Sequence, residues 1–580
     1  MYSHLKVIKN SLTAIMVSSL SFSAVAISAD TALRDARIYT VNEKQTWAEA
    51  VAIRDGEIVY VGDDAGLKDW VGPNTQVIDV DGKLLLPGFI DTHAHPVLAT
   101  ASMNALEINA EDDLATVLEK LQDYADDNPN LDFIMGFGFS HHIFDGDPTK
   151  EMLDAVVSER PVFLADGGGH LGWANSKAFE LAGVNADTPD PIAGSHYYVR
   201  DVKGNPTGYM YEEQTFAAFI NLGQGNVASE MRTNSADLFP LMSSMGITSV
   251  FDASMEWFIE DGHRVMAQLE KEGKLPFRLV TSMTVDRNLS HGEVVNQYKE
   301  FQSQYHSDFL QIGAIKFGLD GTVEGESAAL LNNYLHGGSG ALNWQEKPYG
   351  EIILALDTAG IDIHIHAIGD RAVNVALNAI EAARQQNGFH GTRHTICHTQ
   401  LVQDSDIPRF NQLKVIAQTT PVWHADAPSL EWTTIDETER QKLFPFKSIA
   451  DTGARVTFGS DFPYGGGLEA LVPAYNLEVG HTRVWPGLDV APLPNPKEKL
   501  PLQTLIKGYT LDAAYQLRME DKIGSIEVGK RADLIVMDEN IFEISPQDIH
   551  NVKVEITMVD GKVVYERPFY QWLIEWYLEI

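Results

Sequence analysis

Two histidines separated by a single residue end an apolar run. The run is "LLLPGFIDTHAHP", residues 84–96, and its last residues include His93 and His95. Because residues i and i+2 of a strand point to the same face, the two imidazoles share a face, with Asp91 below them. For a His-x-His pattern taken alone, hydrogen-bonded core histidines or surface histidines are the commoner explanation. Imidazoles that face a buried interior are costly without a strong partner, which favours a bound metal ion.

Further ligand candidates stand at the ends of other apolar runs. His366 closes "IDIHIHAIGD", His398 closes "TICHTQ", and Asp461 follows the apolar part of "VTFGSDFP". Neutral imidazole and carboxylate are the usual ligands of a borderline divalent ion such as Zn²⁺. His364 shares a face with His366, so it is either a competing ligand or a core histidine, and we favour the core interpretation. For His398 taken alone, a hydrogen-bonded interior group is the preferred interpretation.

The elements that carry these residues recur along the chain. Short β-branched runs end in a polar residue and are followed by helix-like segments. Besides residues 84–96, the runs are "GITSVFDAS", "FRLVTSM", "GAIKFGLDG", "IDIHIHAIGD", "RHTICHTQ", "KVIAQTTP" and "ARVTFGSDFP", which makes eight. Alternating strands and helices predict an α/β fold with a parallel sheet, here closed as a TIM-like (β/α)8 barrel over residues 84–522. Active sites of this fold lie at the carboxyl ends of the strands, where the candidate ligands stand.

Two regions do not fit a barrel. Residues 30–83 and 523–568 alternate and turn at Asp-Gly pairs like hairpins, so both ends of the chain are predicted to form one small β-sandwich domain. Residues 102–235 are too long for a connection between two strands. We interpret them as an inserted α/β lid or substrate domain.

The first residues are typical of an export signal. Lys6 and Lys9 precede an apolar stretch over residues 12–27, and small residues are spaced for cleavage after Ala26 or Ala29. We therefore expect a signal peptide over residues 1–29 and a bacterial periplasmic or secreted protein. The alternative is a membrane anchor, but the stretch is shorter than the roughly 20 apolar residues of a spanning helix. The aromatic tail, residues 569–580, is expected to dock on the body, with a membrane-surface role as the alternative.

Composition limits the partners. Asp and Glu total 81 against 43 Lys and Arg, and the formal net charge is −38. Such a surface repels nucleic acid and anionic lipid, so neither is expected as a partner, and no membrane span is expected after signal removal. One cysteine, Cys397, cannot form an intramolecular disulfide. The composition is compatible with a homo-oligomer.

Motifs across nearly the whole mature chain resemble the amidohydrolase superfamily. They are "PGFIDTHAHP", "RPVFLADGGGH", "NPTGYMYE", "GITSVFDA", "AIKFGLDGT", "HIHAIGDRAV", "HTICHTQ", "TFGSDFP" and "GSIEVGKRADLIVMD". More closely, the chain is similar to the amidohydrolase 3 family, the group of YtcJ-like proteins and N-substituted formamide deformylases. The last motif is similar to the family's closing strands of the small β domain, which supports the pairing of the two ends.

The resemblance implies a metal-binding role for residues at matching positions. His93 and His95 match the first-strand ligands, and His366 and His398 match the fifth- and sixth-strand ligands. Asp461 matches the eighth-strand aspartate.

Lys316 in "AIKFGLDGT" stands where binuclear members carry a lysine carboxylated by carbon dioxide. Its carbamate bridges two metal ions, so the resemblance implies two divalent ions, with Zn²⁺ favoured. An inward strand position favours the carbamate because burial disfavours an ammonium. The alternative is a salt bridge from Lys316 to Asp320 or Asp461.

The sequence departs from the family pattern at two places. Cys397 stands where the family usually has Glu before the sixth-strand histidine, and we expect its side chain to face away from the ligands. The family's Asp-Gly-His is stretched to "DGGGH", residues 166–170, which affects the expected substrate pocket.

Four further histidines are candidates to line that pocket. His170 and His424 are predicted to contact substrate. His141 and His142 are weaker candidates, and for all four a surface or supporting role is the alternative.

The ligand set predicts hydrolysis of a small-molecule carbon–nitrogen bond that is not a peptide bond: an amide, formamide or cyclic amide. A metal ion makes hydroxide available at neutral pH, and Asp461 acts as general base and then general acid. His170 is a candidate donor to the anionic intermediate.

Other functions stay open. Ester or lactone hydrolysis and deamination fit the same site, although Lys316 argues against a deaminase because deaminases of the superfamily usually hold one metal without a bridging lysine. A barrel without metal that serves as a scaffold or binding protein is a further alternative. A periplasmic solute-binding protein would have two lobes rather than eight strand runs.

Overall fold

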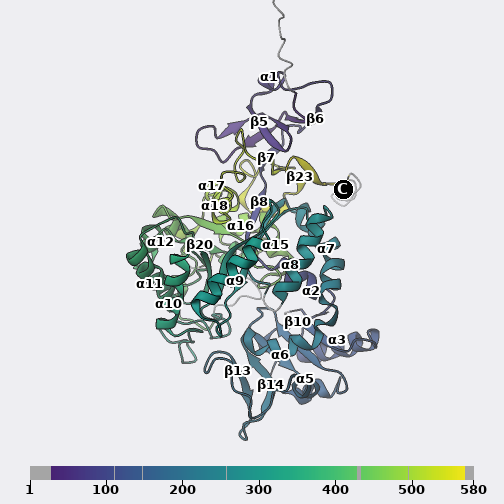
Figure 1. Ribbon diagram of the computed structural model, residues 1–580, viewed down its shortest axis with the longest axis vertical. Helices are drawn as coiled ribbons and strands as arrows, with labels where there is room; N and C mark the ends of the chain where they lie inside the picture. The colour runs from purple at the N-terminus through teal and green to yellow at the C-terminus, as the bar shows by residue number, and fades with distance from the viewer. Residues whose placement is uncertain are drawn as a thin grey trace, which may run out of the picture.

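The computed structural model describes residues 28–568 except 110, 145, 147, 256–257, 427–432 and 494. Most of the predicted signal peptide and the predicted tail over residues 569–580 lie outside the described residues. Figure 1 shows three parts in a row, with the barrel between small sheets at one end and the insertion at the other.

Eight parallel strands form the central sheet, and each pairs with its neighbour in the chain order of the barrel. They are β8 (Phe89–Ala94), β15 (Ile247–Asp252), β16 (Arg278–Thr284), β17 (Leu310–Gly318), β18 (Asp362–Ala367), β19 (Thr395–His398), β20 (Ile416–Thr419) and β21 (Val456–Phe458). Each of the eight predicted runs overlaps one of these strands. The strands are almost entirely buried, which explains why they appear as continuous apolar runs rather than alternating ones. The predicted parallel barrel is confirmed as a nearly closed sheet.

The sheet closes where the end of β21 passes β8. The Thr92 hydroxyl donates to the carbonyl of Phe458 at 2.7 Å, and the amide of Asp461 donates to the carbonyl of His93 at 2.7 Å. A Cβ atom at Gly459 would overlap the backbone of His93, so only glycine permits this approach. The first and eighth strands thereby bring their carboxyl ends together.

Helices surround the barrel on its outer side (Figure 1). They include α2 (Pro96–Ser102), α7 (Val227–Ser244), α8 (Ile259–Lys271), α9 (His291–Gln304), α10 (Glu346–Thr358), α11 (Asp370–Asn387), α12 (Ile407–Leu413), α13 (Glu437–Arg440), α14 (Phe446–Asp451), α15 (Gly467–Leu471), α16 (Pro473–Thr482), α17 (Leu502–Tyr509) and α18 (Leu511–Gln516). Ser290 begins α9 with a capping box that it forms with Glu293. The apolar face of α11 packs into the main core cluster with β17 and β18.

The first predicted barrel strand is two strands, which corrects the expectation that residues 84–96 form one run in the barrel. β7 (Leu84–Pro87) pairs with β22 (Leu534–Met537) and β2 (Arg37–Tyr39) in a different sheet, and β8 begins after Gly88. A side chain at Gly88 would overlap that of Thr248, so the chain crosses between the two sheets at a residue without a Cβ atom. A continuous apolar run cannot reveal this break, because both strands are buried.

Strands from both ends of the chain share that second sheet. Its order is β24 (Lys562–Glu566), β23 (Val554–Val559), β22, β7, β2 and β3 (Trp47–Ala48). A four-stranded sheet of β5 (Glu57–Gly62), β4 (Ala50–Arg54), β1 (Thr31–Arg34) and β6 (Gln76–Asp79) lies beside it, with the short helix α1 (Asp64–Leu67). One apolar cluster contains side chains of both sheets, among them Leu33 and Leu534. The description as a sandwich domain stays a prediction.

The insertion has a sheet of its own. Its strand order is β13 (Tyr197–Arg200), β14 (Pro206–Tyr211), β12 (Leu171–Ala174), β11 (Val162–Asp166), β10 (Ile134–Phe139) and β9 (Leu106–Glu107). Helices α3 (Leu114–Asp127), α4 (Lys150–Asp154), α5 (Ser176–Ala182) and α6 (Ala217–Ile220) accompany it. Its role as a lid stays a prediction.

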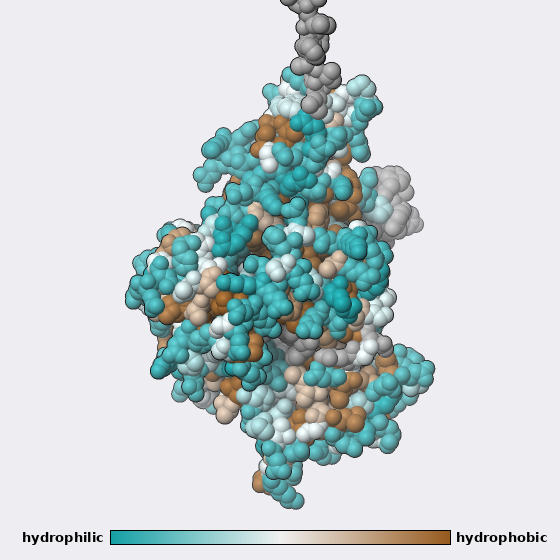
Figure 2. All heavy atoms as spheres, in the orientation of Figure 1, coloured by the Kyte–Doolittle hydropathy of each residue, from teal (hydrophilic) through white to brown (hydrophobic). Residues whose placement is uncertain are grey.

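The molecular surface is mainly hydrophilic on the face in Figure 2, in keeping with the strong negative charge. Among the described residues, no helix is both long and apolar enough to span a bilayer.

Candidate metal centre

Three predicted ligands converge at the mouth of the barrel, which is the end formed by the carboxyl termini of the strands. Asp461 Oδ1 lies 3.1 Å from His93 Nε2 and 3.3 Å from His95 Nε2. The three side chains are buried, and their ligand atoms lie within 4.8 Å of one another. His95 Nδ1 is 3.0 Å from the carbonyl of Ser254, which leaves Nε2 directed at Asp461. Two imidazoles and a carboxylate in this arrangement fit a divalent ion such as Zn²⁺.

The other two predicted histidine ligands lie beside this group. The ring centroid of His398 is 4.5 Å from that of His366 and 4.7 Å from that of His93. His398 also stacks on Trp423 at 5.4 Å. Its Nδ1 is buried and has no hydrogen-bond partner among the described residues. A buried nitrogen without a partner is costly in a folded protein, and coordination of a metal ion would compensate for it.

The backbone is strained at these positions. His398 and Asp461 have φ angles of 67° and 57°, in the left-handed region that only a few per cent of non-glycine residues adopt, aspartate and histidine more often than most. Both residues stand where a strand ends and the chain turns over the barrel mouth. Such strain persists where a functional arrangement requires it, so the backbone supports a functional role for both residues.

The electrostatic environment keeps the histidines neutral and the aspartate ionised. Burial, and then the charge of His170, lowers the pKa of His366 to about 3. Burial, and then Lys316, lowers the pKa of His93 well below its ordinary value. Burial alone raises the pKa of Asp461, but the hydrogen bond from His95 and neighbouring positive charge bring it below the ordinary value. Neutral imidazole and ionised carboxylate are the forms that bind metal.

Lys316 points into the same space. Its Nζ lies 3.4 Å from His93 Nε2 and 3.6 Å from Cys397 Sγ. Among the residues that the structure describes, Lys316 makes no ion pair with Asp320 or Asp461, so the alternative of a salt bridge is not seen. Asp320 instead accepts backbone amides of residues 329, 368 and 369 and holds the loops beside His366.

Cys397 faces the ligands, which corrects the expectation that it faces away. Its Sγ contacts Lys316 inside the barrel, and the residue is fully buried. Strict alternation would place neighbours on opposite faces, but His398 ends β19 in a left-handed conformation, so alternation no longer holds there. His364 also faces this space, because its Nε2 lies 2.9 Å from His93 Nδ1.

The insertion brings His170 to the barrel mouth. Its ring centroid lies 5.6 Å from that of His366, and its Nδ1 lies 2.6 Å from Glu212 Oε2. Although burial opposes it, the Glu212 carboxylate raises the pKa of His170 to about 10. The stretched loop wraps around Asp166, whose Oδ1 accepts the amides of His170 at 2.8 Å and Leu171 at 2.7 Å. The extra glycines therefore form a turn that positions His170.

Glu212 was not singled out by sequence reasoning, although it ends the motif "NPTGYMYE". Its pairing with His170 depends on the neighbouring strands β12 and β14, where Leu171 lies opposite Tyr211. A positive φ of 68° in a buried glutamate is a further sign of function that only the structure provides.

The remaining candidate histidines are not brought to the ligands. His424 is fully buried and stacks on Phe444 at 4.6 Å, with its Nε2 3.3 Å from the Thr419 hydroxyl. His141 contacts the Tyr209 hydroxyl inside the insertion at 2.9 Å, and His142 is exposed. These contacts describe packing, and the predicted substrate contact of His424 has no support in them.

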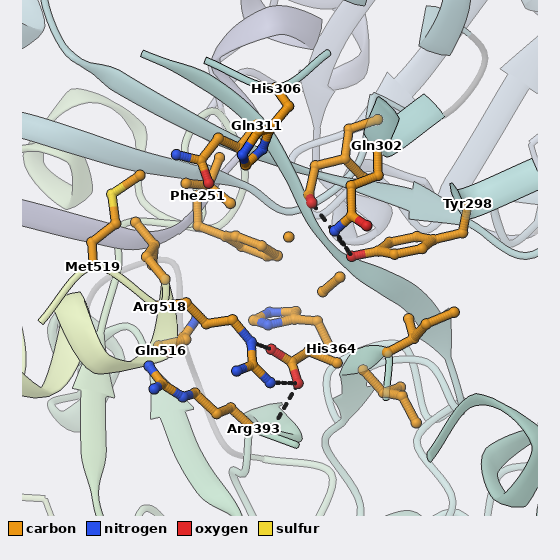
Figure 3. Close-up of a pocket in the computed structure, with 18 of the residues that line it drawn as sticks. Phe251, Tyr298, Gln302, His306, Gln311, His364, Arg393, Gln516, Arg518 and Met519 are labelled. Atoms are coloured by element: carbon orange, nitrogen blue, oxygen red, sulfur yellow. Dashed lines mark hydrogen bonds and ion pairs between the residues drawn. The ribbon is translucent and has the colours of Figure 1, made fainter. Parts of the chain in front are cut away.

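A cavity of about 610 Å³ lies at the base of the barrel, the end formed by the amino termini of the strands (Figure 3). Its wall includes Arg393, Arg518, Tyr298 and His364. Asp461 does not line it, and of these four residues only His364 also contacts a predicted ligand. The strained groups and the unpaired nitrogen of His398 lie at the mouth.

Comparisons with known proteins identify the family. The family model described as "Amidohydrolase family" matches residues 76–565. The chain belongs to the amidohydrolase family. It is therefore a hydrolase that acts on carbon–nitrogen bonds other than peptide bonds.

Relatives of this amidohydrolase cover most of its length. It is 28% identical over 559 residues to an N-substituted formamide deformylase of Arthrobacter pascens, covering 93% of this chain and 98% of that protein. It is 33% identical over 404 residues to the exoenzymes regulatory protein AepA of Pectobacterium carotovorum, covering 68% of this chain and 86% of that protein. An uncharacterized metal-dependent hydrolase from Pyrococcus horikoshii has the same fold, with a TM-score of 0.70, 23% identity, and coverage of 89% of this chain and 99% of that chain.

Proposed function

We propose that this amidohydrolase cleaves an amide, formamide or cyclic amide of a small molecule at a two-metal site. The observation that carries the proposal is the convergence of His93, His95 and Asp461 at the buried mouth of the barrel. His366 and His398 complete the ligand set, and Zn²⁺ is the proposed ion. The likeness to an N-substituted formamide deformylase over 559 residues supports an amide-type substrate.

Lys316 is the proposed bridge between the two ions. In the proposed resting form its Nζ carries a carboxylate derived from carbon dioxide, which turns a repelling ammonium into an anionic ligand. Its position 3.4 Å from His93 Nε2 supports this role, because the new oxygens would lie among the ligands.

The residues of the site divide the chemical work. His93, His95, His366, His398 and Asp461 would hold a divalent ion, which when bound would polarise a carbonyl group and activate water. Asp461, ionised because its pKa is lowered, takes the proton of the attacking water and passes it to the departing nitrogen. His170 is held by Glu212 through Nδ1, so its Nε2 is the nitrogen left to donate a hydrogen bond to the substrate oxygen.

A substrate panel tests the proposal. Purified protein loaded with zinc is assayed against N-acyl, N-formyl, cyclic amide and ester compounds, with Asp461→Asn as the control for contaminating activity. Hydrolysis of at least one amide-type compound, lost in the control, is the expected result. Turnover of esters or lactones alone, or deamination alone, would contradict the proposed substrate class.

We also propose export of the protein to the periplasm or the medium. The basis is the pattern of residues 1–29, which Lys6 and Lys9 begin. Mass spectrometry of protein isolated from its native envelope should find a mature start near Ile27 or Asp30. Recovery of protein that still begins at Met1 would refute the proposal.

A further inference from the structure

A second group of metal-ligand atoms lies on the inner side of the centre. It consists of His93, His364 and Cys397, whose ligand atoms lie within 4.8 Å of one another, and we call it the inner set. All three residues are at most 1% exposed. The inner set shares only His93 with the group formed by His93, His95 and Asp461.

His93 stands between the two groups. Its Nε2 lies 3.1 Å from Asp461 Oδ1, while its Nδ1 lies 2.9 Å from His364 Nε2. The imidazole therefore presents one nitrogen to each side. Figure 3 shows the His364 ring at the wall of the base cavity, so the inner set occupies the level of the barrel between that cavity and the mouth.

The surroundings of Cys397 differ from those of a structural buried cysteine. A buried thiol behaves as a small apolar side chain and commonly packs among apolar neighbours. Cys397 Sγ instead lies 3.6 Å from Lys316 Nζ, and two imidazoles are within reach. A thiolate there would place an anionic ligand atom beside two imidazoles.

We propose that Cys397 is a thiolate ligand of one ion of the metal centre, together with His364. His93 binds a single ion, because a neutral imidazole has only one nitrogen without a proton. The inner ion is then a thiophilic divalent ion such as Zn²⁺ or Co²⁺ rather than Mg²⁺ or Mn²⁺. Binding displaces the thiol proton to solvent, so one proton is released per thiolate bound. The inference rests on the proposed function, because the inner set shares His93 with the proposed metal site.

X-ray absorption of the zinc-loaded full chain tests this ligand directly. The expected result is a sulfur neighbour at about 2.3 Å from one of the two zinc ions, which averages to about half a sulfur per zinc, among nitrogen and oxygen neighbours. Cobalt-substituted protein should also show thiolate-to-cobalt charge-transfer absorption in the near ultraviolet. Both signals can be assigned without ambiguity, because Cys397 is the one cysteine in the chain.

Three variants sharpen the test. Cys397→Ser should lose both sulfur signals and hold the ions about tenfold or more weakly in competition with a chelator. Cys397→Glu is the matched control, because it restores the family's residue and should retain metal without any sulfur signal. His364→Leu removes the inner nitrogen and should also weaken retention of the inner ion.

The outcomes separate this inference from the proposed function. Wild-type protein that binds divalent metal but lacks a sulfur neighbour overturns the thiolate ligand and leaves the proposed function standing. Wild-type protein that binds no divalent metal refutes both. Because the absorption measurement uses the wild-type chain, a variant that fails to fold does not affect it.

Discussion

Buried polar groups are paired at the base of the barrel, whereas at its mouth some of the described ones lack a partner of opposite charge. At the base, one carboxylate has two partners: Arg384 Nη1 lies 2.5 Å and His394 Nε2 lies 2.8 Å from Asp357 Oδ1. At the mouth, His93 lies beside Lys316, and a buried nitrogen of His398 has no partner among the described residues. His394 precedes the short strand β19 and His398 ends it, yet of these two described residues only His394 forms a close pair with a carboxylate.

This difference separates a structural end from a functional one. Complementary charges at the base contribute to the folded state once they are buried together. At the mouth, Lys316 beside His93 and the unpaired nitrogen of His398 lower the stability of the folded protein. Proteins retain such arrangements where activity needs them. Substitutions at the two ends should therefore change different measurable quantities.

The largest expected effect is on activity at the mouth. Asp461→Asn removes the proposed proton acceptor, so kcat on the substrate found by the panel should fall by about 10²- to 10⁴-fold. Stability should fall by less than in the base variant described next, because asparagine fills the space of the carboxylate and mainly the hydrogen bond from His95 is weakened. Kinetics together with denaturant unfolding measure both. If Asp461→Asn lost as much stability as the base variant Asp357→Ala, the distinction between a functional mouth and a structural base would be contradicted.

The opposite effect is expected at the base. Asp357→Ala leaves Arg384 and His394 without their carboxylate and should lower the free energy of unfolding by about 3–5 kcal/mol. Zinc bound per folded chain should not change. Asp451→Ala is the control, because its ion pair with Lys447 is exposed to solvent and should contribute far less to stability. Denaturant unfolding measures the change in stability, and metal analysis measures the zinc bound per chain.

The pH dependence of that effect has a definite sign. Burial raises the pKa of Asp357, but hydrogen bonds from His394, Asn387 and Thr392 hold it well below its ordinary value of 3.8. A lowered folded-state pKa contributes stability that is present above the unfolded pKa and is lost as pH falls through the folded one. The difference between wild type and Asp357→Ala should thus stay constant from about pH 5 to 8 and shrink below about pH 4.

A smaller effect on metal binding tests the bridge at the mouth. Lys316→Ala should weaken metal retention by about 10- to 100-fold, lowering bound metal from about two ions per chain towards one or none. Added acetate or propionate should restore part of the activity by occupying the vacated bridge. Lys316→Arg keeps the charge but cannot form the carbamate, so it should stay inactive without rescue. Full metal content and wild-type turnover in Lys316→Ala would refute the bridging role.

The smallest expected effect concerns substrate choice. His170→Ala should change relative kcat/KM across the panel by roughly tenfold, because the donor from the insertion contacts substrate rather than metal. Metal content should be the same as in the wild type. Loss of metal would instead identify His170 as a ligand and would extend the mouth site into the insertion.

Several features of this protein could be predicted from the sequence alone. The β-branched runs with polar ends predicted the barrel, because buried parallel strands leave this signature and place functional side chains at one end. His93, His95, His366, His398 and Asp461 were chosen from that pattern with the family resemblance, and the structure brings them together. Their role as ligands stays a prediction.

Tertiary structure decided the features that depend on breaks in regular strands. Residues 84–96 divide at Gly88 because the next strand belongs to another sheet, which an apolar run cannot reveal. Cys397 faces inward because His398 leaves the extended conformation, whereas alternation holds only inside a regular strand. The pairing of His170 with Glu212, 42 residues apart, follows from the register of β12 with β14. Local sequence sets the direction of side chains within an element, but contacts between elements depend on how the whole chain packs.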